Sequence, residues 1–449
     1  MRFRARHVAT ATGGVLHGAD VEIDGVSFDS RSLQPGQLFV PLVADRDGHE
    51  FIDGAVARGA AAYLSSRPVP GSSPVPAIEV PDTLRALMRL GSVQRQEFDG
   101  PVIAITGSVG KTSTKDLAWA ALAASRRTWA NERSYNNEQG LPTTVLNTPD
   151  DTEVMVLEMG MRGHGEIGDL CRIARPTIGV ITRVAEAHSD RVGGIEGVAR
   201  AKGELIESLS PNGLAILNHD DPRVHAMAAR SLAPVLYYGE GRDPAVEVRI
   251  SAVRLDDIAR PTFHLDSPWG SVTVHLGVSG RHMVHNAAAA LACVGAAGGD
   301  LHEGAAALAD VGLTAMRMEV RRTASGVTVL NDAYNANPTS MRAALDALAA
   351  LPATRRIAVL GLMAEIADPE REHREIVEYA RGHRIDVIAF GTDLYGITPV
   401  ADPVAALGSL PGGEAVLVKG SRVMGLERVA AALLLDEPVD AVDVAPPGE

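Results

Sequence analysis

The sequence has little of what several classes of protein require. Its 449 residues include two cysteines, Cys171 and Cys293, too few for a disulfide framework and without the spacing of a metal site. No apolar run approaches the roughly 18 residues of a membrane-spanning helix. Positive charge is in deficit, with 42 basic against 56 acidic residues, so the average surface would repel phosphate backbones. These absences disfavour a disulfide-rich secreted protein, a membrane-inserted protein and a nucleic-acid-binding protein.

The overall composition is typical of a folded, soluble chain. Hydrophobic residues make up 46% and charged residues 22%, without the polar bias of disordered chains. We therefore expect both cysteines to be small core side chains. Arg2, Arg4 and Arg6 make the N-terminus basic, but the apolar segment of a secretory signal does not follow. We expect a cytoplasmic protein that is not inserted in a membrane.

The length is about three times that of a typical domain, which predicts two or three domains. The first block, residues 1–98, contains alternating apolar segments at residues 21–26 and 38–43. Helical patterns follow at residues 51–60 and 82–98. This block indicates a small mixed α/β unit.

Short apolar runs alternate with helical patterns in the two remaining blocks, residues 99–313 and 314–449. Such runs are typical of strands buried in parallel sheets, whose ligands lie beyond the carboxyl ends of the strands. An alternating β pattern at residues 246–278 and an alanine-rich helical pattern at 283–297 complete the second block. The predicted class is α/β. The runs are residues 102–106, 154–157, 178–181 and 214–217, then 327–330, 357–360, 387–390 and 415–418.

The sharpest local signal follows the run at 102–106. There, between a predicted strand and a predicted helix, the chain reads Gly107-Ser108-Val109-Gly110-Lys111-Thr112-Ser113. Glycines let backbone N–H groups converge on phosphate oxygens, Lys111 can neutralise phosphate charge, and the Thr112 hydroxyl can reach Mg²⁺. Ile105 stands where the full pattern has a glycine, so the loop is shortened. Such a tripeptide also occurs at turns by chance, but this context favours nucleotide binding.

Three further residues fit the chemistry of a bound triphosphate. Glu158 follows the run at 154–157, where a carboxylate can hold Mg²⁺ directly or through water; the alternative is a capping or solvated glutamate. His188 lies beyond the run at 178–181, and Lys202 lies on a helical pattern. Taken alone, each of these two is more often an ordinary surface residue.

Together these segments resemble the Mur ligases, the ATP-dependent amide-forming enzymes of peptidoglycan precursor synthesis. In the centre of the chain the resemblance rests on Thr106-Gly-Ser-Val-Gly-Lys-Thr-Ser, Glu158-Met-Gly, Ala187-His-Ser-Asp-Arg and Ala201-Lys-Gly-Glu-Leu. The first block resembles the UDP-sugar-binding domain of the MurE and MurF branches, through Ser27-Phe-Asp-Ser-Arg-Ser, Pro35-Gly-Gln-Leu-Phe-Val and Asp47-Gly-His-Glu-Phe-Ile. Resemblance narrows to the MurF branch through Asn136-Asn-Glu-Gln-Gly-Leu-Pro, Asn331-Asp-Ala-Tyr-Asn-Ala-Asn-Pro-Thr-Ser-Met-Arg and Val418-Lys-Gly-Ser-Arg.

The resemblance implies a three-domain Mur ligase architecture. Residues 1–98 would bind the UDP-sugar, residues 99–313 would form a central P-loop ATPase domain with a parallel sheet, and residues 314–449 would form a Rossmann-like domain that binds the incoming amino substrate. The implied reaction adds D-alanyl-D-alanine to UDP-N-acetylmuramoyl-tripeptide through an acyl phosphate. ATP and Mg²⁺ are the implied cofactors, and we expect a monomer.

The resemblance also implies a role for each matching residue. The nucleotide would be contacted by Gly107, Ser108, Val109, Gly110, Lys111, Thr112, Ser113, Asn286, Arg317 and Asp332. The implied catalytic residues are Lys111, Glu158, His188 and Lys202, and the implied metal ligands are Thr112, Glu158, His188 and Lys202, the last carried as a carbamate. Substrate contacts would come from Ser30, Arg31 and Asn137, and from Lys419, Ser421 and Arg422 on a loop after the last strand.

Some positions depart from the usual pattern of the family. Val109 and Met283 stand where asparagine is frequent, and Leu362 replaces an aspartate near the implied acceptor site. Asp45-Arg46 occupies a stretch that often has a glycine, and the third peptide residue could be lysine or diaminopimelate. Two alternatives stay open: a ligase of related fold with another acid and amine, such as a folate enzyme, and a nucleotide-binding regulator without ligase activity.

Overall fold

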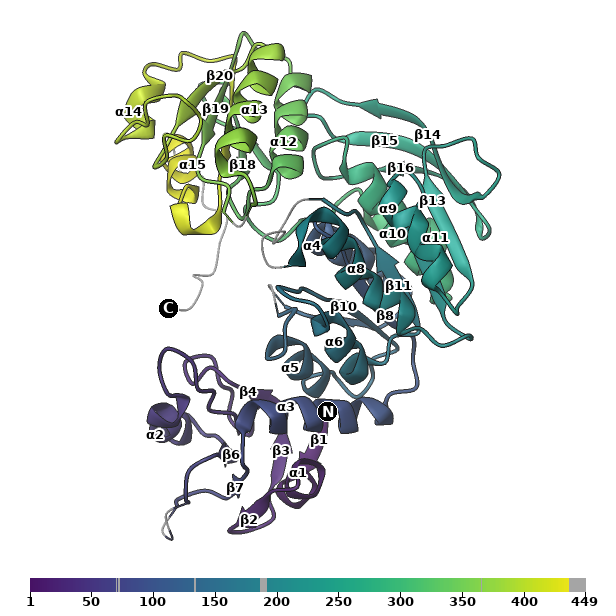
Figure 1. Cartoon of the computed structure of the whole chain (residues 1–449), viewed down its shortest axis with the longest axis vertical. Helices are drawn as coiled ribbons and strands as arrows, with labels where there is room; N and C mark the ends of the chain where they lie inside the picture. Colours follow the sequence, from purple (N-terminus) through teal and green to yellow (C-terminus); the bar gives the residue numbers. More distant parts are fainter. Residues whose placement is uncertain (70, 72, 133–134, 186–191, 365, 436–449) are drawn as a thin grey trace. The chain divides into compact units, whose positions relative to one another are not determined.

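The computed structural model describes residues 1–69, 71, 73–132, 135–185, 192–364 and 366–435 (Figure 1). His188 and residues 436–449 lie outside the described residues. Two compact units form: one comprises Met1–Val253, Phe263–His275 and Val284–Val311, and the other comprises Arg254–Thr262, Leu276–Met283 and the chain from Gly312 onward. No helix in the described part of the chain combines the length and apolar character needed to cross a membrane.

Two small sheets form from the N-terminal residues of the first unit. Antiparallel pairing joins β1 (Arg2–Arg4) to β3 (Glu22–Asp24). The second sheet has the order β2 (Val15–His17), β7 (Ala77–Glu79), β6 (Ala62–Ser65), β5 (Leu38–Phe39), β4 (Val26–Ser27). The helices here are α1 (Ala5–Thr12), α2 (Ile52–Ala57) and α3 (Thr83–Gln94).

The alternating segments at residues 21–26 and 38–43 form short strands, two from the first segment and one from the second. The first segment divides at Gly25, whose φ of +79° turns the chain, so β3 and β4 belong to different sheets. The second ends after Phe39, because Pro41 has no N–H to continue the ladder. Val43, at the end of this segment, lies beyond the strand and is 66% exposed.

A nine-stranded sheet forms the centre of the chain. Its order is β16 (Gly270–His275), β15 (Pro261–Ser267), β14 (Val246–Leu255), β13 (Val235–Gly239), β12 (Leu214–Asn218), β11 (Ile178–Ile181), β8 (Val102–Thr106), β10 (Val154–Glu158), β9 (Thr128–Ala130). From β14 to β9 all neighbours are parallel. The helices are α4 (Lys111–Ala123), α5 (Gly140–Leu146), α6 (Glu166–Ala174), α8 (Gly194–Glu207), α9 (Pro222–Ala226), α10 (Met283–Ala296) and α11 (Leu301–Ala307).

Residues 1–98 and the central sheet pack closely within the first unit. Helix α3 packs against α5 and α6, and Leu146 at the end of α5 belongs to the apolar cluster of the N-terminal sheet. Asn147 then donates to the carbonyl of Val26 at 2.9 Å and accepts from its N–H at 2.7 Å. The two cysteines are buried and free, which confirms the prediction that they are core side chains.

The second unit contains a five-stranded sheet. Its order is β17 (Glu319–Arg322), β18 (Thr328–Asp332), β21 (Glu414–Lys419), β19 (Arg355–Leu360), β20 (Asp386–Ala389). All pairs are parallel except β17 with β18. The helices are α12 (Pro338–Ala350), α13 (Pro369–Gly382), α14 (Pro403–Leu407) and α15 (Glu427–Leu434). The predicted α/β class is confirmed, and the three-domain boundaries stay predictions.

Candidate active site

The glycine-rich loop joins β8, in the middle of the parallel run, to the first turn of α4. Gly110 has φ of +84°, and a Cβ there would lie 2.6 Å from Asn286 Oδ1. A Cβ at Gly107 would collide with the Thr182 hydroxyl. Both glycines are therefore required by close approach, and the loop delivers the N-terminus of a 13-residue helix.

The chain after β11 supports this loop from one side. Thr182 Oγ1 donates to the carbonyl of Val109 at 2.7 Å. Ser108 donates twice, from its N–H to the carbonyl of Arg183 at 2.7 Å and from its hydroxyl to the carbonyl of Ala185 at 2.8 Å. The glycine-rich loop is thus held in place by hydrogen bonds to the residues that follow β11.

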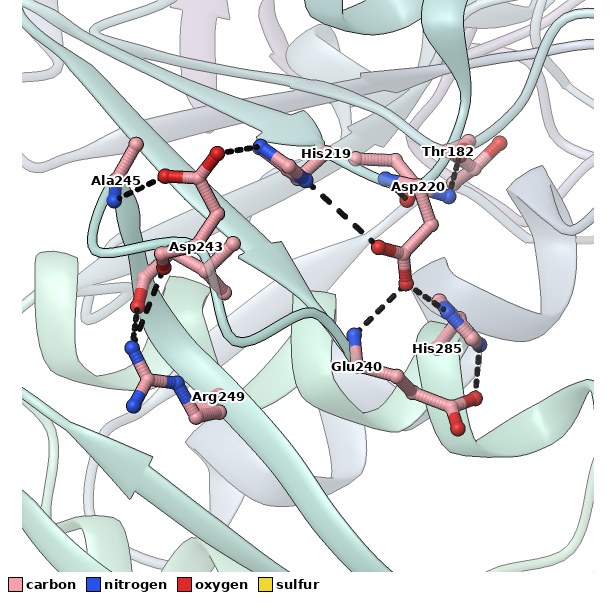
Figure 2. Close-up of polar contacts among 10 residues, drawn as sticks. Thr182, His219, Asp220, Glu240, Asp243, Ala245, Arg249 and His285 are labelled. Atoms are coloured by element: carbon pink, nitrogen blue, oxygen red, sulfur yellow. Dashed lines mark hydrogen bonds and ion pairs between the residues drawn. The ribbon is translucent and has the colours of Figure 1, made fainter.

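A second tier of polar contacts holds Thr182 (Figure 2). Asn218 Nδ2 donates to the Thr182 carbonyl at 2.9 Å, and the hydroxyl of the buried Tyr238 donates to the same oxygen at 3.2 Å. Asn218 Oδ1 accepts from the N–H of Asp220 at 3.0 Å. These bonds connect the ends of β11, β12 and β13 beneath the glycine-rich loop.

Asp220 in turn reaches the helix that carries Asn286. Its Oδ2 lies 2.9 Å from His285 Nε2 and accepts from the N–H of Glu240 at 2.7 Å. Figure 2 shows the two side chains pointing toward one another. The hydrogen bond from His285 is the largest cause that holds the pKa of Asp220 below its ordinary value. The predicted nucleotide contact Asn286 therefore follows a residue that is bonded to Asp220, in the chain just after β12.

Glu158, the last residue of β10, lies against the first turn of α4. Thr112 Oγ1 donates to Glu158 Oε2 at 2.7 Å, and Asn136 Nδ2 donates to Oε1 at 2.6 Å. Glu158 is 2% exposed and Thr112 is 3% exposed. The structure thus brings together two of the predicted metal ligands, each with an oxygen donor.

Asn136, next to the predicted substrate contact Asn137, is a partner of Glu158 that the sequence alone did not single out. Gly160 explains how Asn136 approaches: a Cβ at Gly160 would lie 2.8 Å from Asn136 Oδ1, and the Gly160 N–H donates to the Asn136 carbonyl at 2.8 Å. The Glu158-Met-Gly motif therefore combines a carboxylate with the glycine that admits its partner. The sequence signal for this contact was the asparagine pair Asn136-Asn137, which precedes the predicted metal ligand Glu158.

The two lysines of the predicted site lie on the glycine-rich loop's helix and on α8. Lys111 Nζ donates to the carbonyl of Gly107 at 2.8 Å. Lys202 lies on α8, is 3% exposed, and has a pKa well below its ordinary value, chiefly because of burial and then of the charge on Lys111, while Glu158 opposes the shift. Lys202 therefore interacts electrostatically with both Lys111 and Glu158.

The donor set fits a hard divalent cation. Carboxylate and hydroxyl oxygens are the ligands that Mg²⁺ prefers, and Glu158 and Thr112 supply one of each. A lysine ammonium cannot bind a cation, so Lys202 fits only in another chemical form. Among the described residues there is no cluster of three or more His, Cys, Asp or Glu side chains arranged around a common point.

The predicted substrate residues of the first unit have local partners. Arg31 is 81% exposed at its side chain and pairs with Asp29 at 2.8 Å. Ser30, between them, is partly exposed. Asn137 Oδ1 accepts from the N–H of Gly140 at 3.0 Å and so caps the start of α5. No hydrogen bond or ion pair of the described residues joins Ser30, Arg31 or Asn137 to Glu158, Thr112 or Asn136.

The second unit carries a separate group of predicted residues. The prediction that Lys419 lies on a loop was wrong: it is the last residue of β21. There it is buried beside Asp332, which ends β18. The Arg317 guanidinium lies 4.2 Å from the centre of the Tyr334 ring. Ser421 Oγ accepts from the N–H of Ala364 at 2.9 Å.

Arg422 is half exposed and pairs with Glu427 at 2.5 Å. Its Nη1 also contacts Met316 Sδ at 3.5 Å. Among the departures from the family pattern, Met283 is 2% exposed, and the carbonyl of Leu362 accepts from the N–H of Ser421 at 2.9 Å. Leu362 therefore keeps a main-chain role that needs no aspartate.

The central and C-terminal parts of the chain each match a known protein family. Residues 105–294 match the profile of the Mur ligase middle domain, and residues 316–409 match that of the Mur ligase glutamate ligase domain. The chain is 40% identical, over 93% of either protein, to a UDP-N-acetylmuramoyl-tripeptide--D-alanyl-D-alanine ligase of Mycobacterium tuberculosis. The chain belongs to the Mur ligase family.

Solved Mur ligases confirm the predicted fold and branch. MurF from Acinetobacter baumannii is similar with a TM-score of 0.88 at 29% identity, covering 97% of this chain and 99% of that one. MurF ligase from Thermotoga maritima, solved in complex with ADP, has a TM-score of 0.81 at 27% identity, covering 92% of this chain and 97% of that one. The individual site residues of this Mur ligase stay predictions, supported by the contacts above.

Proposed function

We propose that this chain is a cytoplasmic, ATP-dependent ligase that adds D-alanyl-D-alanine to UDP-N-acetylmuramoyl-tripeptide in peptidoglycan precursor synthesis. The observation that carries the proposal is the buried contact of Thr112 with Glu158 at the glycine-rich loop. It occurs in a chain whose curated relatives at 40% identity bear this activity in their names.

The reaction has to make a carboxylate reactive toward an amine. A carboxylate oxygen of the tripeptide attacks the γ-phosphorus of ATP, ADP leaves, and an acyl phosphate forms. The amine of D-alanyl-D-alanine then attacks the carbonyl carbon, a tetrahedral species forms, and inorganic phosphate leaves as the amide bond is completed. Lys111 and the N–H groups of the loop and of α4 offset the charge on the phosphates.

Mg²⁺ would be held by Thr112 and Glu158, where its charge would offset that of the phosphoryl oxygens. Asn136 keeps the Glu158 carboxylate in place through its second oxygen. His188 is proposed as a further ligand from the motif in which it stands.

Lys202 is proposed to act as a carbamate. Its side chain is buried near a second lysine, and burial there disfavours an ammonium. Carbamate formation requires the free amine, and its product is an anion with oxygen ligands. That form suits a place beside a divalent cation, whereas an ammonium would be repelled.

The remaining residues would bind substrates. Asn286, beside Gly110, would contact adenine, and Arg317 and Asp332 would contact the rest of the nucleoside. Ser30 and Arg31 would contact the uridine diphosphate and Asn137 the peptide, while Lys419, Ser421 and Arg422 would serve the dipeptide. The proposed domains are residues 1–98, 99–313 and 314–449, in a monomer.

One assay tests this function and its alternatives. Phosphate release is measured with ATP, UDP-N-acetylmuramoyl-tripeptide and D-alanyl-D-alanine, and each substrate is omitted in turn. We expect phosphate release only when all three substrates are present. Testing tripeptides that end in lysine and in diaminopimelate shows which of them the enzyme accepts. Release with a folate and glutamate instead would support a ligase for another acid and amine, and nucleotide binding without any release would support a regulator.

A further inference from the structure

Asn131 holds the main chain of Glu158 from the neighbouring strand. It follows β9 directly, and its amide Oδ1 accepts from the Glu158 N–H at 2.9 Å while Nδ2 donates to the Glu158 carbonyl at 3.1 Å. The parallel ladder of β9 with β10 ends at the pair Ala130 and Val156, so the Asn131 side chain continues it to the residue that carries the carboxylate. Asn131 is 1% exposed.

Lys115 fixes Asn131 from the glycine-rich loop's own helix. Lys115 Nζ donates to the Asn131 carbonyl at 3.0 Å and forms an ion pair with Asp116 at 2.7 Å. The lysine is 5% exposed. Since Lys115 lies three residues after Thr112 on α4, both side chains leave the same face of the helix.

These contacts close a circuit around the carboxylate. Thr112 bonds to the Glu158 side chain, Asn131 bonds to the Glu158 main chain, and Lys115 returns from Asn131 to the helix that carries Thr112. Every bond lies in a buried setting, where hydrogen bonds are strong and an unpaired polar group is costly. The circuit therefore fixes both ends of Glu158 relative to α4.

We infer that Asn131 and Lys115 are positioning residues, which set the place of the Glu158 carboxylate relative to Thr112 and thereby the affinity for the divalent cation that accompanies the nucleotide. The inference rests on the proposed function, because it takes Glu158 as a ligand of that cation. Neither side chain is assigned to the cation itself. Outer partners of metal ligands typically change metal affinity about 10–100-fold when they are removed.

The chain offers a matched control for this inference. Asn147 makes the same double bond to a main chain, accepting from the Val26 N–H at 2.7 Å and donating to its carbonyl at 2.9 Å. It bonds to β4 of the N-terminal sheet, not to Glu158. Asn131 Nδ2 also donates to the carbonyl of Tyr135 at 2.8 Å, a bond that Asn147 does not match. Asn147→Ala therefore removes a comparable pair of side-chain bonds to one main chain without releasing the carboxylate.

The test measures Mn²⁺ affinity, by the electron paramagnetic resonance signal of free Mn²⁺, in the full chain with a nonhydrolysable ATP analogue. Asn131→Ala and the isosteric Asn131→Asp should raise the Mn²⁺ Kd about 10-fold or more, and Lys115→Met should raise it several-fold. Asn131→Asp loses the donor to the carbonyls of Glu158 and Tyr135 and turns a carboxylate oxygen toward both. Asn147→Ala should lower the unfolding midpoint and leave the Mn²⁺ Kd unchanged. In the ligase assay the half-saturating Mg²⁺ concentration should follow the same order.

Two negative results have different meanings. If the wild-type chain joins its substrates and all three Asn131 and Lys115 variants, folded, bind Mn²⁺ as it does, the positioning inference is overturned while the function stands. A wild-type chain without ligase activity would contradict the proposed function instead. If Asn131→Ala does not fold, Asn131→Asp and Lys115→Met decide the matter.

Discussion

Lys419 Nζ lies 2.5 Å from Asp332 Oδ2, where the adjacent parallel strands β21 and β18 end side by side. The ammonium also donates to the carbonyl of Asn335 at 2.9 Å, and the lysine side chain is 2% exposed. Asp332 in turn accepts from the N–H of Met318 at 3.1 Å. Two residues proposed for different ligands, the dipeptide and the ribose, thus depend on each other for their position.

A pair whose lysine is buried and whose carboxylate is 16% exposed predicts coupling between the two residues. Breaking a fully buried pair costs about 3–5 kcal/mol, so Lys419→Met should destabilise the second unit by no more than that, because it leaves the partly exposed Asp332 carboxylate without its cation. The double variant Lys419→Met/Asp332→Asn should recover part of that loss, since no unpaired charge remains. Hydrogen exchange of the β18 and β21 amides measures the effect in this unit. Strictly additive single-variant effects would contradict the coupling.

Lys111→Ala should abolish turnover without unfolding the protein. Its ammonium donates to the loop carbonyls of Gly107 at 2.8 Å and Ser108 at 3.5 Å, and the side chain is only partly buried, so its loss should cost little packing. Loss of one preorganised charge contact typically costs about 10²–10³-fold in rate, and the phosphates here would lose their nearest cation. Phosphate release gives the rate, and a thermal melt is the control. Full activity with unchanged melting would exclude the phosphate-loop assignment.

Much of the nine-stranded sheet and the helices around it could be predicted from the sequence. The run at 102–106 became β8 and the predicted helix after it became α4, because strand, glycine turn and helix are local and consecutive. Glu158 was placed correctly at a strand end, since buried parallel strands are continuous apolar runs. These signals need no knowledge of which strand lies beside which.

What depends on strand order could not be predicted. Asn131 reaches Glu158 only because β10 lies between β8 and β9, an order that the apolar runs do not encode. The contact of Asn136 with Glu158 could not be predicted for the same reason, since the sequence does not show which side chains meet at a strand end. Lys419 was assigned to a loop because its strand continues one residue beyond the apolar run.

His285→Gln should remove a pH-dependent contribution to the stability of the first unit. The bond from His285 lowers the pKa of Asp220, so the stabilisation is present above the unfolded value of about 3.9 and is lost as the pH falls through the lower folded value. We expect a loss of about 0.5–1 kcal/mol at pH 7, as for partly exposed pairs, that shrinks toward zero below pH 4. Urea unfolding of wild type and variant at several pH values measures it.

The control for this variant is His17→Gln. His17 lies 3.0 Å from Glu79 in a pair whose side chains are 41% and 42% exposed, against 24% for His285 and 31% for Asp220. The control should therefore cost less at pH 7. If the His285→Gln effect were the same at pH 7 and pH 3.5, Asp220 would not be the titrating group.

Substitutions of Lys202 distinguish an anion from a cation beside Glu158. Lys202→Ala should be nearly inactive, and short carboxylates such as acetate should restore part of its rate, because they can enter the vacated space and replace the carbamate anion. Lys202→Arg should stay inactive, since a guanidinium keeps its positive charge and cannot be carboxylated. Rates are measured by phosphate release, with chloride at equal ionic strength as the control for acetate.

The Lys202→Arg result separates the two roles. Lys202 is 3% exposed and is affected by the charge of Lys111, and if its role were only to contact a phosphate as a cation, arginine would serve as well as lysine. Wild-type activity in Lys202→Arg would therefore show that Lys202 acts as a positive contact and would exclude the carbamate.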